Sequence, residues 1–171
     1  MNEDFILSRR SIRHYTDQAV SEENIHYLLH AGMSAPSASN EQPWHFIVVR
    51  DRDRLLRITE AHPHAGMLRS AALAILICAD MNESKYEPEL DYWVQDCAAA
   101  TENILLAANR IGLGACWLGV HPRAERKDKL RQLFALPTQI IPFSIVSLGY
   151  PGEQKTDGDR YRSERVHRNE W

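Results

Sequence analysis

The feature that most restricts the fold of this chain is a continuous apolar run at residues 71–79, AALAILICA. A short run without polar alternation is typical of a β-strand whose two faces are both covered by other elements. The run therefore predicts a central strand, and a fold in which further elements pack on both sides of a sheet.

Helical and strand patterns alternate around this run. Helices are predicted over 21–32, with Ser21 as N-cap and Gly32 as stop, and over 53–61, 91–111 and 124–134. Further strands are predicted at 44–49, 114–120 and 143–148. The long helix over 91–111 carries small alanines that permit close packing, so we expect it to be the spine of the core. The pattern indicates one α+β or α/β domain over residues 1–171, without repeats or a linker.

Charge and hydropathy exclude some classes of partner. Twenty Lys and Arg against 23 Asp and Glu give a formal net charge of −3, which offers no general attraction for nucleic acid or an anionic membrane. No apolar run approaches the roughly 18 residues that span a bilayer, and the N-terminal sequence lacks the pattern of a signal peptide. We therefore expect a cytoplasmic protein.

The cysteines and histidines give no metal or redox motif. Cys78, Cys97 and Cys116 lie among apolar or small residues without a C-x-x-C pair, which predicts buried, reduced thiols. His62 and His64 come closest to a metal pair, but no third ligand follows at a recognisable spacing. A loop with two solvated imidazoles is the expected structure there.

The first candidate for chemistry is the run RRSIR, which contains Arg9, Arg10, Ser11 and Arg13. In extended backbone, residues 9, 11 and 13 share one face and present two guanidiniums and a hydroxyl. Such a face suits the oxygens of a phosphate monoester, because arginine forms bidentate, charge-assisted hydrogen bonds. A solvated basic turn explains the same run equally well.

The second candidate is the loop at residues 36–44, PSASNEQPW. It places small hydroxyls, two amides and a tryptophan around prolines that restrict its shape. These donors and acceptors suit the edge of a flat heterocycle with carbonyls and ring nitrogens. A plain helix-to-strand connector is the alternative.

Taken together, RRSIR and PSASNEQPWHF resemble the signature of the nitroreductase family, R-x-S-x-R/K followed by P-S-S-x-N-x-Q-P-W-x-F. AILICAD, GLGACWLG, SLGYPGE and the ending RYRSERVHRNEW agree with that family in the same order, so the resemblance covers nearly the whole chain. It implies an α+β fold with a mixed, mainly antiparallel sheet flanked by helices. It also implies an intertwined homodimer with FMN at each of two interfaces, in which residues 152–171 dock on the partner subunit.

The resemblance further implies the site residues. Arg9, Ser11 and Arg13 would hold the FMN phosphate and ribityl chain, with main chain from Arg10 and a late phosphate contact from Arg160. From the partner subunit, the flavin would be reached by Pro36, Ser37, Ala38, Ser39 and Gln42. Trp117, Leu118 and Gly119 would lie against the ring, with a backbone donor near Gly119 directed toward flavin N5.

Four departures from the family pattern qualify this assignment. Gly119 stands where longer members have a glutamate, so only a backbone role transfers. Gly158 replaces a late lysine, and Ala38 removes one hydroxyl from the loop, so weaker FMN binding is expected. The stretch at 80–91 is short where larger members carry a helical excursion, which predicts an open pocket and a broad range of acceptors.

The implied activity is that of an NAD(P)H-dependent FMN oxidoreductase. NADH or NADPH would be the donor, a nitroaromatic, quinone or similar small molecule the acceptor, and the kinetics ping-pong. The chemistry would reside on the flavin, so no catalytic side chain is expected. No Gly-rich βα fingerprint for a separate nicotinamide site is present. Two alternatives stay open: the same fold used for dehalogenation or flavin breakdown, and a flavin-binding or redox-sensing module without turnover.

Overall fold

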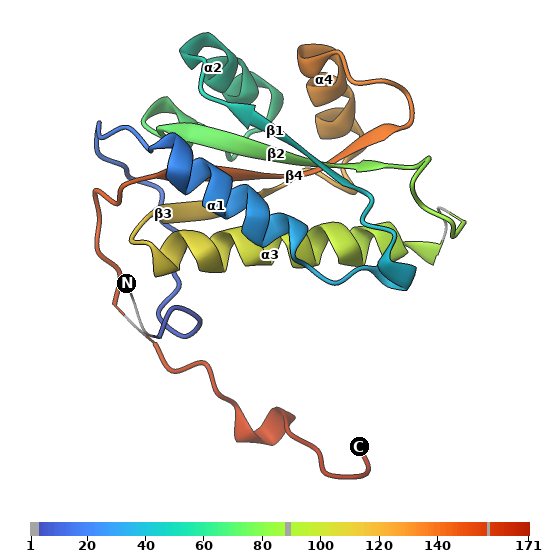
Figure 1. Cartoon of the computed structure of the whole chain (residues 1–171). Helices are drawn as coiled ribbons and strands as arrows, with labels where there is room; N and C mark the ends of the chain where they lie inside the picture. The colour runs from blue at the N-terminus through green and yellow to red at the C-terminus, as the bar shows by residue number, and fades with distance from the viewer. Residues whose placement is uncertain (1–3, 88–89, 157) are drawn as a thin grey trace.

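Helices cover both faces of a four-stranded sheet in the computed structural model, which describes residues 4–87, 90–156 and 158–171 (Figure 1). The strands are β1 (Trp44–Val49), β2 (Leu73–Asp80), β3 (Gly114–Gly119) and β4 (Ile140–Gly149), in the spatial order β1-β2-β4-β3. Neighbouring strands are antiparallel, with Trp44 opposite Ala79, Leu73 opposite Leu148 and Gly114 opposite Gly149. Parallel pairing in the described part of the chain is confined to the isolated bridge between Ser11 and Ala115. The α+β class is confirmed.

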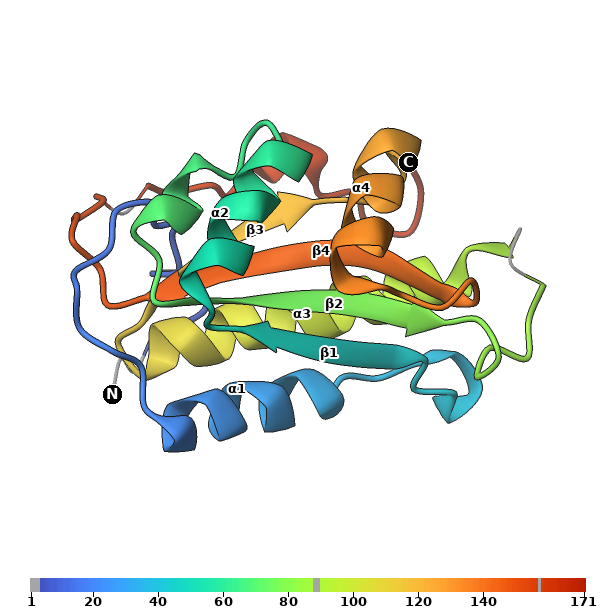
Figure 2. The same ribbon diagram turned by 90° about the horizontal axis from the view of Figure 1, so that it is seen from above.

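The helices form two layers. One face of the sheet carries α1 (Glu22–Met33) and α3 (Tyr92–Arg110), and the other carries α2 (Arg52–Ala61) and α4 (Ala124–Phe134) (Figure 1, Figure 2). Short 3-10 turns lie at η1 (Ala38–Asn40), η2 (Gly66–Arg69) and η4 (Ser163–Arg165). Within the described ranges, no helix combines the length and the apolar character needed to cross a membrane.

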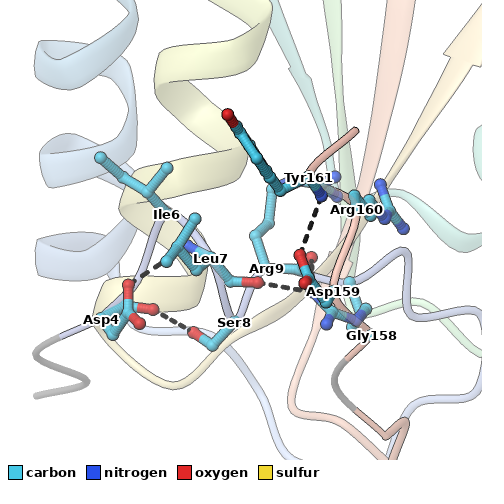
Figure 3. Close-up of a pocket in the computed structure, with 10 residues that line it drawn as sticks. Asp4, Ile6, Leu7, Ser8, Arg9, Gly158, Asp159, Arg160 and Tyr161 are labelled. Carbon is cyan, nitrogen blue, oxygen red and sulfur yellow. Dashed lines mark hydrogen bonds between the residues drawn. The ribbon is translucent and has the colours of Figure 1, made fainter. Parts of the chain in front are cut away.

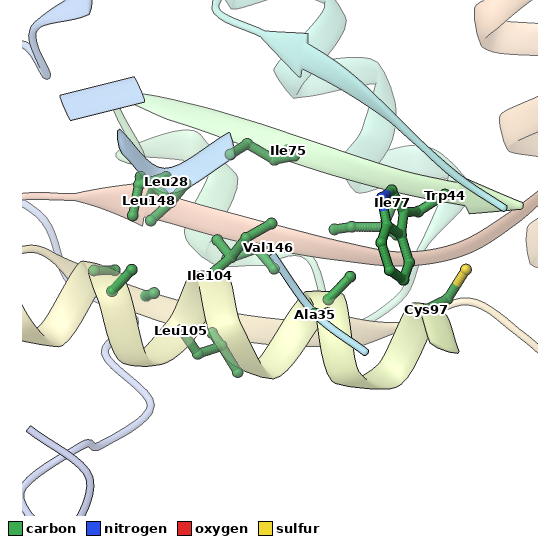
Figure 4. Packing of buried hydrophobic residues seen from close by; sticks show 14 of the residues in the cluster. Leu28, Ala35, Trp44, Ile75, Ile77, Cys97, Ile104, Leu105, Val146 and Leu148 are labelled. Atoms are coloured by element: carbon green, nitrogen blue, oxygen red, sulfur yellow. The ribbon is translucent and has the colours of Figure 1, made fainter. Parts of the chain in front are cut away.

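Each face of the sheet has its own apolar core. On the α1/α3 face, Ile75 and Ile77 of β2 pack with residues such as Ile104 of α3 (Figure 4). Leu76 and Cys78 point to the α2/α4 face, because successive residues of a strand alternate between faces. β2 is therefore buried along all but its last residue, as its apolar run predicts. The three cysteines are buried and free, which confirms their predicted state.

The predicted bounds of α1 and α2 each differ from the structure by one residue at one end, and α2 begins at Arg52 where the prediction begins at Asp53. The Ser21 side chain accepts a hydrogen bond from the Asn24 N–H, so Ser21 is the N-cap of α1 as predicted. The predicted stop at Gly32 is wrong, because α1 continues to Met33. A Cβ at Gly32 would lie 3.0 Å from Ile104 Cδ1, so this glycine allows α3 to approach closely.

The N-terminal segment is anchored on the free edge of β3. The Ile12 N–H donates to the Ala115 carbonyl at 2.9 Å, and the buried Tyr15 phenol is 2.7 Å from Ser147 Oγ. A Cβ added at Gly114 would lie 2.7 Å from Ile12 Cγ2. The segment can approach the strand this closely only because position 114 has no side chain.

The C-terminal tail runs away from the body of the molecule on the side of α3 (Figure 1). All residues of 158–171 are exposed, and Trp171 is fully so. Within the tail, the Tyr161 N–H donates to Asp159, and the His167 and Trp171 rings stack with centroids 4.4 Å apart. The tail therefore buries none of its own apolar residues in this chain.

We predict that Gly114→Ala destabilises the protein by about 1–3 kcal/mol, because the added methyl group overpacks against Ile12. Gly66→Ala is the matched control, since a Cβ there meets no atom within 4 Å. Urea denaturation followed by circular dichroism measures both free energies of unfolding. Equal effects of the two substitutions would contradict the close approach of Ile12 to β3.

Candidate functional site

Basic side chains from the two ends of the chain gather beside the N-terminal segment. Arg9, Arg10 and Arg160 line a cavity of about 710 Å³ (Figure 3). Arg10 and Arg160 also line a neighbouring cavity of about 470 Å³ together with Lys155, whose Nζ donates to the Ser11 carbonyl at 2.8 Å. The structure thus brings the predicted Arg160 to the predicted RRSIR segment.

Lys155 is a basic residue that the sequence analysis did not assign to the site. Gly158 was read as the loss of a late lysine, yet Lys155 brings an ammonium group to the same segment from three residues earlier. It lies in the polar tail, where no periodic pattern distinguishes one lysine from another. Its proximity to Ser11 becomes visible only when the two ends of the chain are placed together.

Several of these charges have partners within the chain. Arg9 Nε lies 3.6 Å from Glu102 of α3, and the Arg10 guanidinium donates to the Leu7 and Thr156 carbonyls. Glu153 accepts the Arg13 N–H at 2.6 Å, and this bond is the main reason why the pKa of Glu153 lies below its usual value. Arg10 and Glu153 therefore hold the backbone of the N-terminal segment against the start of the tail.

Arg13 faces a different cavity from the other arginines. That cavity, of about 340 Å³, is also lined by His14, His64, Met67 and Ser70. The Arg13 guanidinium also donates to the Ser11 carbonyl at 3.5 Å, so Arg13 stays beside the segment that carries Arg9. His64 and Met67 reach this cavity from the segment after α2, and the sequence analysis did not assign them to a site.

The free edge of β3 presents backbone groups next to this segment. The Ala115 carbonyl accepts from Ile12, and the Gly119 carbonyl accepts from His62 and Arg126, none of which belongs to β4. In a strand, the N–H and C=O of one residue point to the same edge, and every second residue repeats that direction. The N–H groups of Trp117 and Gly119 therefore point to the open edge. A Cβ at Gly119 would meet nothing within 4 Å, so this end of the strand is also open in front of the glycine.

His62 is buried, so the expected pair of solvated imidazoles is wrong at this position. The residue is 1% exposed, and its Nε2 lies 2.9 Å from the Gly119 carbonyl oxygen. Burial is the largest cause that lowers the pKa of His62. His64 is exposed, as predicted. In the described residues, no group of three or more His, Cys, Asp or Glu side chains could hold a metal ion.

The loop at residues 36–42 is strained. Ser39, Asn40 and Gln42 have φ angles of 47°, 58° and 53°, which place three non-glycine residues in the left-handed region. Such conformations cost about 1–3 kcal/mol each and persist where surrounding contacts impose them, often at functional sites. This observation disfavours the plain connector that the sequence left open.

One side chain within the loop and two outside it hold its shape. The Ser37 hydroxyl accepts the Gln42 N–H at 2.9 Å, Asp96 of α3 accepts the Ala38 N–H at 2.9 Å, and Ser39 Oγ lies 2.8 Å from the Tyr86 hydroxyl. Among the described residues, the second carboxylate oxygen of the buried Asp96 finds no hydrogen-bond partner. Desolvation raises the pKa of Asp96. The hydrogen bond from the Ala38 N–H lowers this pKa in part, and the nearby charge of Glu41 raises it.

The loop and the basic cluster do not meet within one chain. The loop leads into β1 at one edge of the sheet, whereas Ser11 and Gly119 lie at β3 on the opposite edge. Three interstrand spacings separate these edges by about 14 Å. Of the predicted site residues, the structure therefore assembles two groups. One comprises Arg9, Arg10, Ser11, Arg13, Trp117, Leu118, Gly119 and Arg160, and the other Pro36, Ser37, Ala38, Ser39 and Gln42.

The chain is therefore an α+β protein with a basic cluster at one edge of its sheet and a strained polar loop at the opposite edge. Comparison with known families agrees with that class. The sequence profile of the Nitroreductase family matches residues 6–65 and 58–150. The chain belongs to the nitroreductase family.

Individual relatives are similar over their whole length. A protein of Archaeoglobus fulgidus, named provisionally as an NADH dehydrogenase/NAD(P)H nitroreductase, is 54% identical over 97% of this chain and 96% of its own. An FMN-dependent nitroreductase from Clostridium difficile R20291 has a TM-score of 0.90 and 31% identity, with 98% of both chains covered. A Desulfovibrio desulfuricans protein, named provisionally as a nitroreductase and solved in complex with FMN, has a TM-score of 0.84 and 32% identity, covering 100% of this chain and 99% of its own.

We predict that Asp96→Asn stabilises the protein at neutral pH, since it removes a buried charge and keeps an oxygen that can accept from Ala38. A raised folded-state pKa means that the folded protein binds the proton more tightly than the unfolded chain. The carboxyl group therefore adds stability below its ordinary pKa of 3.8, and this contribution is lost as pH rises through the raised value.

The advantage of Asp96→Asn over the wild type should accordingly grow between pH 4 and pH 7, as measured by urea denaturation at each pH. Asp17→Asn, at an exposed position, is the matched control. A pH-independent difference between Asp96→Asn and wild type would show that this carboxylate is not the source of the effect.

Proposed function

We propose that this chain is an FMN-dependent oxidoreductase that takes two electrons from NADH or NADPH and delivers them to a small acceptor, such as a nitroaromatic or a quinone, with ping-pong kinetics. The observation that carries the proposal is the arrangement along one edge of β3. A basic cluster lies at the start of the strand, and an open backbone donor lies at its end. The names of the A. fulgidus and C. difficile relatives support the same activity.

The residues along β3 fit FMN in both chemistry and length. Ser11 pairs with Ala115, and Gly119 follows four residues later, about 13 Å along the strand. A phosphate near Arg9, Ser11, Lys155 and Arg160 would find guanidinium and ammonium donors. The five-carbon chain of FMN can join that position to a ring placed at Gly119, where a Cβ would meet no atom.

When bound, FMN supplies the chemistry, because its ring accepts a hydride equivalent from a nicotinamide and passes electrons to an acceptor. The protein binds and orients it. Arg9, Ser11, Arg13, Lys155 and Arg160 would hold the phosphate end, with Arg10 fixing the backbone beneath them. The N–H groups of Trp117 and Gly119 would face the ring edge, with Leu118 buried behind it. In this proposal the nicotinamide and the acceptor use one pocket in turn, and no side chain is catalytic.

We further propose that the active species is an intertwined homodimer. The polar loop with Pro36, Ser37, Ala38, Ser39 and Gln42 lies across the sheet from Gly119, so only a second copy can bring it to the same ring. Exposed apolar side chains support this arrangement, because they lie on α1, at or just before the start of α3, near the N-terminus and in the tail. They are Ile6, Leu7, Tyr27, Met33, Leu90, Tyr92, Tyr161, Val166 and Trp171. In the described ranges, α2 and α4 carry none of this kind. Residues 152–171 would cover the partner, and the expected cytoplasmic location stays a prediction.

The purified protein should be yellow, or become so with FMN. The colour should bleach with NADH or NADPH without oxygen and return when a quinone or nitroaromatic is added. Arg13→Ala should weaken FMN binding by about 1.5–3 kcal/mol, through loss of one charge-assisted contact, and Arg57→Ala on the exposed side of α2 should not. Fluorescence titration of FMN measures both variants.

Three outcomes of this experiment would count against the proposal. A protein that binds no FMN contradicts the cofactor, and a yellow protein indifferent to both nucleotides is a carrier or sensor. Steady-state patterns that require a ternary complex contradict the ping-pong order.

Truncation after Gly152 should release monomers and weaken FMN binding by at least about tenfold, because it removes the tail together with Lys155 and Arg160. Analytical ultracentrifugation and FMN titration measure the two effects. Arg160→Ala in the full chain is the control, since it should weaken FMN binding and leave the association of the FMN-free protein unchanged. A truncated protein that remains dimeric would contradict docking of the tail.

A further inference from the structure

Gly119 is held by two side chains whose roles the proposed function does not include. His62 follows α2, and its Nε2 lies 2.9 Å from the Gly119 carbonyl oxygen. Arg126 of α4 reaches the same oxygen at 2.7 Å and lies 3.3 Å from His62 Nε2. A side chain that directly follows α2 and a side chain of α4 thus converge on one backbone carbonyl at the end of β3.

The hydrogen bonds define the tautomer of His62. The His64 N–H donates to His62 Nδ1 at 3.2 Å, so Nδ1 is an acceptor and the ring proton sits on Nε2. His62 Nε2–H then donates to Gly119, and Arg126 donates to the same oxygen without a bond to the imidazole. Burial and the charge of Arg126 both lower the pKa of His62, so the ring is neutral at neutral pH.

Gly119 needs such support for a physical reason. A glycine has no Cβ to restrict its φ and ψ angles, and Gly119 is the last residue of an edge strand. Its N–H and its carbonyl point to the same open edge, as the alternation of β3 requires. The Gly119 N–H lies in the peptide unit shared with Leu118, which pairs with Ile145 of β4, whereas the Gly119 carbonyl lies in the following unit. Two donors on the carbonyl hold that following unit, and the two units together restrict φ and ψ at Gly119 and so limit the movement of its N–H.

We propose that His62 and Arg126 are positioning residues that aim the Gly119 N–H at the ring of the bound flavin. This inference rests on the proposed function, because it assigns the ring to Gly119. Neither side chain needs to touch the cofactor, and no proton leaves His62. Loss of His62 or Arg126 would allow the Gly119 N–H to shift from its direction toward the ring. Small displacements of this kind reduce rates strongly.

The test uses the full-length protein loaded with FMN. His62→Leu removes the donor and puts an apolar side chain of similar size in its place. His62→Gln offers an amide N–H near the position of Nε2. Arg126→Met removes the second donor at a half-buried site, whereas His62 is buried. Arg123→Ala, on an exposed residue at the start of α4, is the matched control.

Four quantities are compared: the visible spectrum of bound FMN, its midpoint potential, its dissociation constant, and the rate of reduction by NADH. We expect His62→Leu and Arg126→Met to shift the spectrum, lower the potential and slow reduction on the order of tenfold. His62→Gln should recover most of the loss, and Arg123→Ala should match wild type. The dissociation constant of FMN should change much less than the rate, because the phosphate contacts are intact.

The outcomes separate this inference from the function on which it rests. Wild-type protein that binds no FMN, or whose FMN is not reduced by either nucleotide, overturns both. Wild-type protein that is reduced normally while His62→Leu and Arg126→Met retain its spectrum, potential and rate overturns the positioning role alone. If His62→Leu fails to fold, the comparison of Arg126→Met with Arg123→Ala decides the question.

Discussion

The contact between the N-terminal segment and the free edge of β3 is the constraint on which the candidate site depends. An edge strand exposes unpaired backbone groups, and the segment through Ile12 donates to the Ala115 carbonyl. His62 and Arg126 occupy the Gly119 carbonyl, and the N–H groups of Trp117 and Gly119 point to the edge where a ligand can reach them. The same contact carries the arginines of the segment to the strand, and it requires the bare backbone of Gly114. Pairing along the whole of β3 would close this sheet edge. The short pairing seen here places the arginines at the start of β3 and leaves the Gly119 N–H available at its end.

The second group of residues is organised by strain. Three residues of the 36–42 loop are held in the left-handed region, and the bond between Ser37 and Gln42 inside the loop acts together with contacts from outside it. Asp96 and Tyr86 supply contacts from two other segments, and Asp96 does so as a buried carboxylate with an unpartnered oxygen. The loop therefore retains its shape at a cost in both backbone energy and desolvation. This combination is typical of a surface prepared for a ligand. It contrasts with the ordinary N-caps of α1 and α2, where Ser21 and Asp51 accept backbone N–H bonds from Asn24 and Arg54.

Sequence reasoning reached most of the elements and part of the site, and its errors have a common origin. The apolar run before Asp80 and the serine before α1 carry local signals, since burial on two faces and capping are decided by near neighbours. Gly32 was read as a helix stop because its contact with Ile104 lies far along the chain. His62 was expected in solvent for the same reason, because Gly119 and Arg126 cover it from other elements. Lys155 was overlooked in a tail without periodicity. Strand order, and with it the separation of the two groups of residues, is likewise absent from any local pattern.

The exposed tail has a thermodynamic consequence for a protein assembled in the proposed way. Its aromatic and aliphatic side chains, Trp171 among them, are solvated in a single chain, so the free energy of covering them belongs to association and not to folding. If the same association completes each cofactor site, occupancy and assembly become one linked equilibrium. If cofactor binding strengthens the association of the two chains by some factor, association raises the affinity for the cofactor by the same factor. Dilution alone would then release both together, so the concentration of the protein itself would act as a control on its cofactor content.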